Sequence, residues 1–314
     1  MNLSVIIPVF NSANVLEKNL PKVLEAVKDY HDGKIEIILT DDNSSDNSTK
    51  VIGDFIKKYK SDAIDIKLLM SDENQGFSSN VNRGAQAAKG ESLILLNADV
   101  IPSKNFLDPL LSHFMDESLF AVGCMDESVE NGKIVLRGRG LGRWKKGFLV
   151  HSKGSIDKTN TLWVSGGSSA FRRSIWEELG GLDGLYNPFY WEDIDLSYRA
   201  LKSGYKLAFD KNSVVRHEHE KGVIKREFSS NEIKKIAYRN QFIFVWKNAD
   251  LTNLLIHIFF LPYHLITSIA SKDYLLSVGF LNALIRLPKI IKSRSKSSKR
   301  FVLSDKKIIA DFTS

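Results

Sequence analysis

Short apolar runs alternate with longer amphipathic stretches over the first hundred residues of the chain. Four runs, each rich in β-branched residues or leucine, occur at residues 3–10, 34–40, 64–70 and 92–96. Runs of this kind are typical of strands that are buried on both faces of a parallel sheet. Helical patterns follow the first three runs, at residues 11–30, 47–60 and 74–90. The alternation predicts a βαβ series, and hence an α/β fold with a mostly parallel sheet flanked by helices.

The pattern continues to about residue 225, with one interruption. Further helices are expected at 105–116 and 191–202, and strands at 120–125, 163–171, 205–209 and 214–220. Residues 127–162 lose periodicity and are rich in Gly, Lys and Arg. A long irregular stretch inside a compact domain is typical of a binding loop or lid. We therefore expect residues 127–162 to be irregular and to border a binding site.

Acidic residues occur where three of these predicted elements begin or end. They are Asp41 and Asp42 after one strand, Asp99 after another, and Glu192, Asp193 and Asp195 at the start of a helix. Taken singly, such residues are common in turns and at helix N-termini, where they bond to backbone N–H groups or complement the helix dipole. Gathered at one edge of a sheet, they would repel one another unless a cation or a ligand offset their charge. Hard oxygen ligands at such a site suit Mg²⁺ or Mn²⁺ bridging phosphate groups.

Residues 226–314 are expected to be helical throughout, with a basic end. Residues 251–269 are apolar but are interrupted by Asn253, His257, Pro262 and His264, which predicts an interfacial or core-packed helix rather than a transmembrane one. No acidic residue occurs from 274 to 304, where seven Lys and Arg residues supply much of the net charge of +7. Apolar helices beside a basic cluster predict peripheral contact with anionic lipid through residues 251–300. The alternative is a solvated basic tail on a soluble helical cap.

Composition narrows the class of protein. The 43% hydrophobic and 26% charged fractions are ordinary for a globular chain. A nucleic-acid-binding protein would have aromatic residues among its basic ones, and residues 292–300 contain none. Cys124 is the only cysteine, expected to be an inert core residue, so no intrachain disulfide forms. This fits a reducing compartment, and the absence of a basic region ahead of the first apolar run argues against a secretory signal, so a cytoplasmic protein is expected.

Seven motifs, in order along residues 1–225, resemble those of family 2 glycosyltransferases, the inverting, nucleotide-sugar-dependent type with the GT-A fold. They are SVIIPVFN (4–11), TDDNSSDNS (40–48), NQGFSSNVNRG (74–84), LLNADV (95–100), GGLD (180–183), WEDIDLSYR (191–199) and HEHEKG (217–222). One such motif is weak, but seven in the same order are specific. The resemblance implies a Rossmann-like GT-A domain at 1–225, a helical extension at 226–314 and a Mg²⁺ or Mn²⁺ cofactor.

The resemblance also implies roles for individual positions. Asp193 corresponds to the general base that deprotonates the acceptor hydroxyl, and Asp99 to the metal ligand of the family's DxD motif. The first position of that motif is Asn97, a weaker and neutral ligand, although related rhamnosyltransferase-like enzymes with an LNPD-type motif share this feature. His217 corresponds to a histidine that completes metal or diphosphate binding. The other donor-binding positions are Pro8, Val9 and Phe10 around the base, Asp41 or Asp42 as its hydrogen-bond acceptor, Asn82 and Arg83 near the phosphates, and Ala98 and Glu192.

Several further residues have two interpretations. His219 could replace His217 as a ligand, because the two share a face if they lie in a strand. Trp163 and Trp191 could stack on sugar rings or pack in the core. Gly166–Gly167 either lets the backbone approach the donor sugar or permits a turn.

The function implied is sugar transfer from a nucleoside diphosphate-sugar to a saccharide or lipid-linked saccharide, in surface polysaccharide synthesis. The chemistry needs one carboxylate to take the acceptor proton and a cation to stabilise the leaving diphosphate, but no second carboxylate as a nucleophile. Residues 127–162 would shape the choice of acceptor, and the sequence identifies no partner for His151 within them. The competing hypothesis is a catalytically silent sugar-nucleotide or glycan-binding protein, which Asn97 favours and Asp193 opposes.

Overall fold

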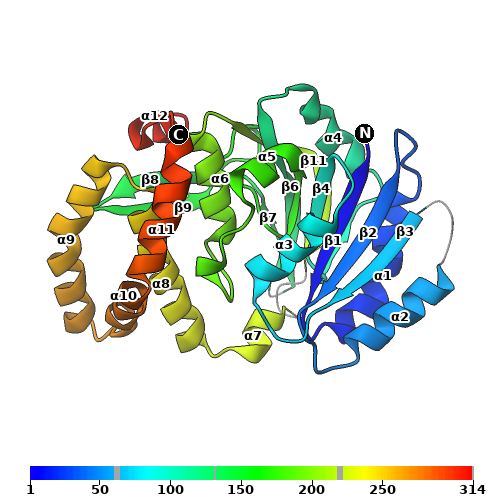
Figure 1. The fold of residues 1–314 in the computed structure, drawn as a ribbon, viewed down its shortest axis with the longest axis horizontal. Coiled ribbons are helices and arrows are strands. Elements are labelled where there is room, and N and C mark those ends of the chain that lie inside the picture. Colours follow the sequence, from blue (N-terminus) through cyan, green and yellow to red (C-terminus); the bar gives the residue numbers. More distant parts are fainter. Residues whose placement is uncertain (60–63, 131, 218–221, 313–314) are drawn as a thin grey trace.

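A computed structural model describes residues 1–59, 64–130, 132–217 and 222–312. Within these residues a nine-stranded sheet lies at the centre, with the strand order β3-β2-β1-β4-β10-β6-β11-β5 and with β7 paired to β6 (Figure 1). The strands are β1 (Leu3–Val9), β2 (Ile35–Asp41), β3 (Ile64–Met70), β4 (Ser92–Leu96), β5 (Val100–Pro102), β6 (Leu119–Glu130), β7 (Lys133–Arg137), β10 (Ser168–Arg172) and β11 (Lys206–His217).

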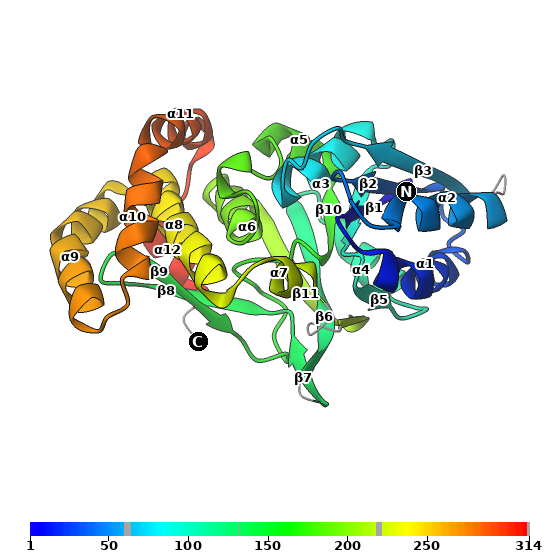
Figure 2. The ribbon, with the colours of Figure 1, turned by 90° about the horizontal axis from the view of Figure 1, so that it is seen from below.

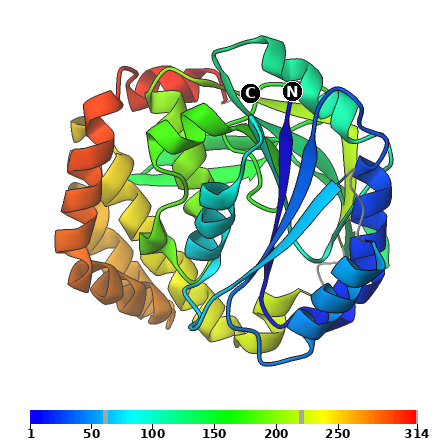
Figure 3. The same ribbon diagram turned by 45° about the vertical axis from the view of Figure 1, so that its right-hand side comes forward.

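The first part of the sheet has the predicted βαβ arrangement. β1 to β4 are parallel neighbours, connected by α1 (Ala13–Val27), α2 (Ser48–Lys58) and α3 (Phe77–Ala87). Successive residues of β1 face opposite sides of the sheet, so that Val5 packs on the side of α1 and α2 and Ile6 on the side of α3. Figure 3 shows β1, β2 and β3, in blue, between the two sets of helices. β1, β2 and β4 are apolar because both of their faces are covered, which is why the sequence pattern identifies them.

The rest of the sheet is mixed. β10 runs antiparallel to both β4 and β6, and β5 runs antiparallel to β11, whereas β6 and β11 are parallel. The predicted parallel sheet is therefore confirmed from β3 to β4, and it does not extend across the whole sheet. The two strands predicted at 205–209 and 214–220 form one strand, β11, as far as His217, because a register shift between Asp210 and Val214 accommodates the polar residues between them. Residues 218–220 lie outside the described residues.

The prediction of an irregular stretch at residues 127–162 is wrong. β6 continues to Glu130 and pairs with β7, and a hairpin of β8 (Gly140–Lys145) and β9 (Phe148–Lys153) follows. The hairpin turns at Lys146 and Gly147, whose φ values of 49° and 77° suit a tight turn between twisted strands. Much of β7 and most of β9 are exposed. Their apolar runs, at residues 134–136 and 148–150, are only three residues long, which is shorter than the runs of four or more residues that identify a strand in the sequence.

The C-terminal region is helical, as predicted. Its helices are α7 (Val223–Glu227), α8 (Ser230–Asn248), α9 (Leu251–Ala270), α10 (Leu275–Ile285), α11 (Leu287–Ser297) and α12 (Asp305–Ala310). A capping box begins α8, in which Ser229 and Glu232 each accept a hydrogen bond from the backbone N–H of the other. α8 and α10 pack closely because Gly279 has no side chain where it meets Tyr238 and Arg239. Figure 2 shows α9, α10 and α11 at the far end of the molecule from β3.

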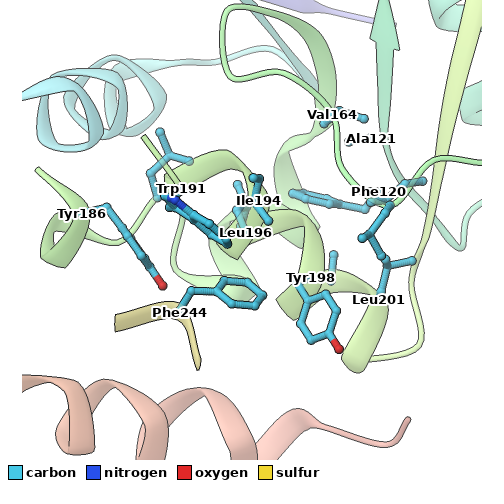
Figure 4. Packing of buried hydrophobic residues seen from close by; sticks show 14 of the residues in the cluster. Phe120, Ala121, Val164, Tyr186, Trp191, Ile194, Leu196, Tyr198, Leu201 and Phe244 are labelled. Carbon is cyan, nitrogen blue, oxygen red and sulfur yellow. The ribbon is translucent and has the colours of Figure 1, made fainter. Parts of the chain in front are cut away.

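One buried cluster joins these helices to the rest of the molecule. The ring of Phe244, on α8, lies 5.2 Å from the ring of Trp191 and 5.2 Å from that of Tyr198, which belongs to α6 (Glu192–Lys202). Figure 4 shows Phe244 between these residues, with Phe120 of the sheet further along the same cluster. α8 therefore packs against α6 through the ring of Phe244. The division of the chain at residue 225 stays a prediction, and the two predicted parts share this core.

Candidate active site

A cavity of about 400 Å³ lies at the carboxyl ends of β1 and β4. Open α/β sheets bind ligands at this edge, beyond the ends of their parallel strands. The walls come from the two strand ends, the turn before α3, the loop before β10, the segment leading into α6, and α7. Most of the predicted site residues line the cavity, namely Pro8, Val9, Phe10, Asp42, Asn97, Ala98, Asp99, Glu192, Asp193 and His217.

Three predicted donor-binding residues are not among those that line the cavity. Asn82 donates a hydrogen bond to the carbonyl of Leu182 at 2.7 Å and accepts one from its N–H at 3.0 Å. Arg83 donates to the backbone carbonyl of Asp41 at 2.6 Å. These side chains support the wall of the cavity rather than form it, and of the two adjacent aspartates it is Asp42 that lines the cavity.

Asp42 fixes the turn that precedes α3. Its carboxylate accepts hydrogen bonds from the N–H groups of Gln75 at 3.0 Å and Gly76 at 2.8 Å. Gly76 has a φ of 84°, and a Cβ at this position would lie 2.8 Å from the side chain of Asn187, so glycine alone fits. Burial raises the pKa of Asp42, and the two N–H groups oppose this shift without cancelling it.

Asp99 and His217 face each other beyond the end of β4. β5 pairs with β11 so that Val100 is opposite His217, which brings Nε2 of the imidazole to 3.2 Å from Asp99 Oδ2. Asp126, at the end of the predicted strand in β6, lies 3.3 Å from Nδ1 of the same ring. Burial disfavours the charged ring, but the hydrogen bonds with Asp126 and Asp99 raise the pKa of His217 to about 9. In this arrangement an imidazolium bridges two carboxylates.

Asp193 lies in the first turn of α6, against the loop before β10. Its Oδ2 accepts a hydrogen bond from Gly166 N–H at 3.3 Å, and its Oδ1 accepts one from Ile194 N–H at 2.8 Å. Burial raises the pKa of Asp193, and these N–H groups and the neighbouring His151 only partly oppose the shift. Burial also raises the pKa of Glu192 well above its ordinary value, and its Oε2 has no hydrogen-bond partner among the described residues. A carboxylate with a raised pKa is a stronger base than an ordinary one.

The sequence profile of glycosyltransferase family 2 matches residues 4–180, which is more than half of the chain. The chain belongs to this family. Among curated relatives of the glycosyltransferase, the O-antigen chain rhamnosyltransferase RfbN of Salmonella typhimurium is 27% identical over 223 residues, 70% of this chain and 67% of the relative. The O-antigen chain rhamnosyltransferase WbaN of Salmonella anatum is 27% identical over 188 residues, 59% of this chain and 56% of the relative. The match thus spans between about half and two thirds of these relatives.

Solved structures have the same fold. S. aureus TarS in complex with UDP-GlcNAc has a TM-score of 0.58 at 16% identity, over 99% of this chain and 91% of TarS. The mannosyltransferase PcManGT from Pyrobaculum calidifontis, in complex with GDP-Man and Mn²⁺, has a TM-score of 0.55 at 16% identity, over 95% of this chain and 85% of that one. At these identities the likeness shows the fold alone. The glycosyltransferase therefore has the expected GT-A fold, and its family membership supports a sugar-transfer function.

The side chains beyond β4 suit a divalent cation in kind. The amide Oδ1 of Asn97 is buried and has no hydrogen-bond partner among the described residues. Gly167 leaves room for this amide, because a Cβ at position 167 would lie 2.5 Å from the amide nitrogen of Asn97. Asp99 and Asp126 add carboxylates, which hard cations prefer. Within the part of the chain that is described, no three or more His, Cys, Asp or Glu side chains already surround one metal position, so cation binding would require the contacts of His217 to rearrange.

Packing assigns Trp191 to the core and gives His151 its partners. Trp191 is a core residue, and its ring and that of Trp163 lie 5.3 Å and 5.2 Å from the ring of His151. The partners of His151 are therefore two indoles from outside its own hairpin. Cys124 is buried, and burial raises the pKa of its thiol to about 12, which confirms an inert core residue. His219 lies outside the described residues.

The sequence reasoning missed three charged residues of the site. Asp126 follows an apolar run directly, which is the signal that identified Asp99, but it falls between the strand predicted at 120–125 and the stretch at 127–162 and was assigned to neither. Lys225 and Arg226, on α7, line the cavity. Arg226 also donates a hydrogen bond to Asn14 Oδ1 at 3.1 Å, which ties α7 to the start of α1. No local pattern marks these two basic residues, because nothing in the sequence indicates that α7 folds back over the strand ends.

Proposed function

We propose that this glycosyltransferase moves a sugar from a nucleoside diphosphate-sugar to a hydroxyl of a saccharide or lipid-linked saccharide, with inversion, during surface polysaccharide synthesis. The proposal depends on one observation, that the half-buried carboxylate of Asp193 and the pair Asp99–His217 line a single cavity. Proton abstraction and stabilisation of the leaving group therefore have their groups in one site. The O-antigen rhamnosyltransferases at 27% identity support a hexosyl or deoxyhexosyl donor.

Asp193 acts as the general base. Its carboxylate takes the proton of the acceptor hydroxyl while the hydroxyl oxygen bonds to the anomeric carbon and the bond from that carbon to the diphosphate oxygen breaks. This single displacement inverts the configuration and releases the nucleoside diphosphate. The N–H groups of Gly166 and Ile194 hold the carboxylate in place. Burial raises its pKa, which increases its strength as a base.

The donor nucleotide lies against the ends of β1 and β2. Residues 8–10 give its base an apolar surface. Asp42 accepts a hydrogen bond from the base, since a carboxylate has lone pairs beyond the two that Gln75 and Gly76 use. Lys225 and Arg226 supply positive charge to the diphosphate from the opposite element, α7.

Asp99, Asn97 and His217 are the residues that would hold a divalent cation, Mg²⁺ or Mn²⁺. When bound, the cation offsets the negative charge that grows on the leaving diphosphate. Two structures with this fold, GalNAc-T7 and PcManGT, were solved with Mn²⁺, which supports a divalent metal here. In this chain, the buried amide oxygen of Asn97 supports a cation site, because it has no hydrogen-bond partner among the described residues.

We also propose that α9 and α10 contact a membrane without crossing it. Among the described residues, α9 is the one helix long and apolar enough to span a bilayer, and only 11% of it is buried. His257 and His264, two of the polar interruptions in its sequence, lie 3.1 Å and 2.9 Å from the carbonyls of Gly147 and Lys146. These contacts fix α9 to the turn of the β8–β9 hairpin, along the surface of the protein. A helix fixed in this way suits the membrane interface better than a spanning position.

Exposed apolar residues on α9 and α10, followed along the chain by exposed basic residues, have the composition of a membrane-contacting region. The apolar residues are Leu251, Leu255, Ile258, Phe259, Ile266, Ile269, Leu281 and Ile285, and the basic residues, on α11 and the turn after it, are Lys289, Lys292, Lys296, Lys299 and Arg300. Apolar side chains enter the acyl boundary while Lys and Arg contact anionic headgroups. Contact through residues 251–300, on the cytoplasmic face, would bring a lipid-linked acceptor close to the enzyme. Co-sedimentation with phosphatidylglycerol vesicles should be lost in Phe259→Asp, and equal binding of both proteins would contradict the assignment.

Thermal stabilisation by nucleoside diphosphates, with and without Mn²⁺, tests the donor site. A ligand that binds only the folded protein raises its melting temperature by mass action. The expected result is a shift with one base that depends on Mn²⁺ and that Asp99→Asn reduces to the metal-free value. A shift that is the same without Mn²⁺ would remove the cation from the proposal. No shift with any nucleotide would favour the silent glycan-binding alternative, which Asn97 suggests.

A further inference from the structure

The segment that leads into α6 forms part of the cavity wall and ends at the proposed general base. Pro188, Phe189 and Tyr190 line the cavity. Tyr190 and Trp191 have φ values of 71° and 75°, a left-handed conformation that residues with a Cβ rarely adopt. Two such residues in succession persist only where their surroundings hold them. Asp193 lies two residues after Trp191, so the direction of its side chain depends on the contacts that hold this segment.

Two neighbouring side chains of α8 bond to four of the five carbonyl groups of residues 186–190. The distances are 2.8 Å from Asn240 Nδ2 to Tyr186 O, 2.9 Å to Phe189 O and 2.8 Å to Tyr190 O, and 2.6 Å from Arg239 Nη2 to Asn187 O. The fifth carbonyl, of Pro188, accepts a hydrogen bond from the N–H of Phe77 at 3.1 Å. Every carbonyl group of residues 186–190 therefore accepts a hydrogen bond, and most of these bonds come from Arg239 and Asn240.

Arg239 also orients Asn240. Its Nε donates to Asn240 Oδ1 at 2.9 Å, which turns the NH₂ group of the amide toward the segment. Both residues are buried. Among the described residues Arg239 has no carboxylate partner, and burial lowers its pKa to about 10. Burying a cation without a counter-charge is costly, so a position that only filled space would suit an apolar side chain better. The guanidinium instead bonds to backbone carbonyls.

A second attachment lies just after the proposed base. Asp195, two residues beyond Asp193, accepts hydrogen bonds from Asn248 at 2.7 Å and Lys247 at 2.8 Å, both on α8. Asp193 is thus bracketed by two sets of contacts to the same helix. A change in the position of α8 would be transmitted to both sides of the base.

We propose that Arg239 and Asn240 are positioning residues for glycosyl transfer, holding residues 186–190 so that Asp193 is aimed at the acceptor hydroxyl. The inference rests on the proposed function, in which Asp193 is the general base. Neither residue is among the described residues that line the cavity, so each acts through the segment it holds. α8 becomes part of the catalytic apparatus, although it lies outside the residues 4–180 that the family profile matches.

Asn240→Ala tests the proposal, because it removes the donor to three carbonyls and replaces no side chain that lines the cavity. We expect kcat for sugar transfer to fall about 100-fold, since a misplacement of about 1 Å at a catalytic group costs about this much. The Kd of the nucleoside diphosphate, measured by calorimetry, should change by less than about two-fold, because the nucleotide does not depend on Asp193. Asn253→Ala is the matched control. It removes a hydrogen bond of 2.8 Å to Asp305 in the same group of helices, away from the segment, and should alter neither quantity.

A double-mutant cycle with Asp193→Asn separates positioning from general stability. In the Asp193→Asn background, Asn240→Ala should lower the residual transfer rate no further, because the group that it positions is already gone. An equal loss in both backgrounds would overturn the proposal, as would a kcat for Asn240→Ala within about two-fold of the wild-type value. If Asn240→Ala melts below the assay temperature, Arg239→Gln takes its place, with a smaller loss of kcat and the same coupling to Asp193. Normal turnover by Asp193→Asn alone would instead refute the proposed function, so the two failures are distinguishable.

Discussion

Replacing Lys247 with methionine removes the charge that pairs α8 with two carboxylates. Its Nζ lies 2.6 Å from Asp183 Oδ2 and 2.8 Å from Asp195 Oδ2, and only 1% of the side chain is exposed. Methionine fills a similar volume but has no ammonium group, so the buried carboxylate of Asp195 and the half-buried carboxylate of Asp183 lose part of their compensation. Asp195 keeps its ion pair with Arg199, whose Nε lies 2.7 Å from Asp195 Oδ2.

Breaking a buried ion pair costs about 3–5 kcal/mol, because the remaining charge is left without a partner. Since Arg199 remains beside Asp195, we expect the lower end of this range, a loss of about 3 kcal/mol in the free energy of unfolding at pH 7. Burial opposes the ionisation of Asp183 and Asp195, but Lys247 and the other partners lower both pKa values. The stabilisation is therefore present above about pH 4, the ordinary carboxyl pKa, and is lost as the pH falls through the lowered values. The variant lacks this stabilisation, so the difference between the two proteins in the free energy of unfolding should become smaller as the pH falls below about 4.

Urea unfolding of both proteins at pH 7 and pH 3, followed by tryptophan fluorescence, measures this difference. Lys206→Met is the matched control, because the Lys206 side chain is 64% exposed where it pairs with Asp116, and no measurable change is expected. A loss at pH 7 below about 1 kcal/mol, the value of a surface pair, would refute the assignment of a buried network that joins α6 and α8. An equal loss at both pH values would refute its electrostatic origin.

Three further predictions concern the packing of Phe244, the pKa of Asp193 and the reactivity of Cys124. Phe244→Ala should lower the free energy of unfolding by about 3–5 kcal/mol, because a fully buried ring is lost between Trp191 and Tyr198, and urea unfolding with an unchanged m value checks this. The acid limb of kcat/KM should have an apparent pKa above 3.8, because burial raises the pKa of Asp193, and a limb at or below 3.8 would contradict it. Cys124 should resist a thiol reagent at pH 8 in the folded protein, because burial raises its pKa to about 12, and fast labelling under native conditions would show that the thiol is accessible.

The parts of the fold that the sequence predicted are those in which burial is continuous. β1, β2 and β4 are buried along their whole length, so their apolar runs stand out, whereas β3, at the edge of the sheet, is mostly part-exposed. The helices between these strands have one apolar face. The β8–β9 hairpin was missed because most of β9 is exposed and its turn, Lys146–Gly147, is short. The two buried residues of β9 are adjacent, at its start, so the strand has no alternation of buried and exposed positions for the sequence to reveal.

Site residues were predictable where chemistry follows a strand end or opens a helix, as at Asp99 and Asp193. Asn82 was placed near the donor because of its motif, yet its amide bonds to Leu182, a hundred residues further along the chain. Contacts of this kind follow from the packing of α3 against a segment far along the chain, and the local sequence pattern cannot predict them. The same holds for Asn240, an unremarked polar residue in an amphipathic helix, whose partners lie about 50 residues earlier.

The most direct test of the account compares sugar transfer and nucleotide binding in Asp193→Asn. The amide has the shape of the carboxylate but cannot take the acceptor proton. The account predicts that transfer falls about 10²–10⁴-fold, the usual contribution of a general base, while thermal stabilisation by the nucleoside diphosphate with Mn²⁺ is retained. Transfer at a near-normal rate would contradict the assignment of Asp193 as the base, whatever the nucleotide binding.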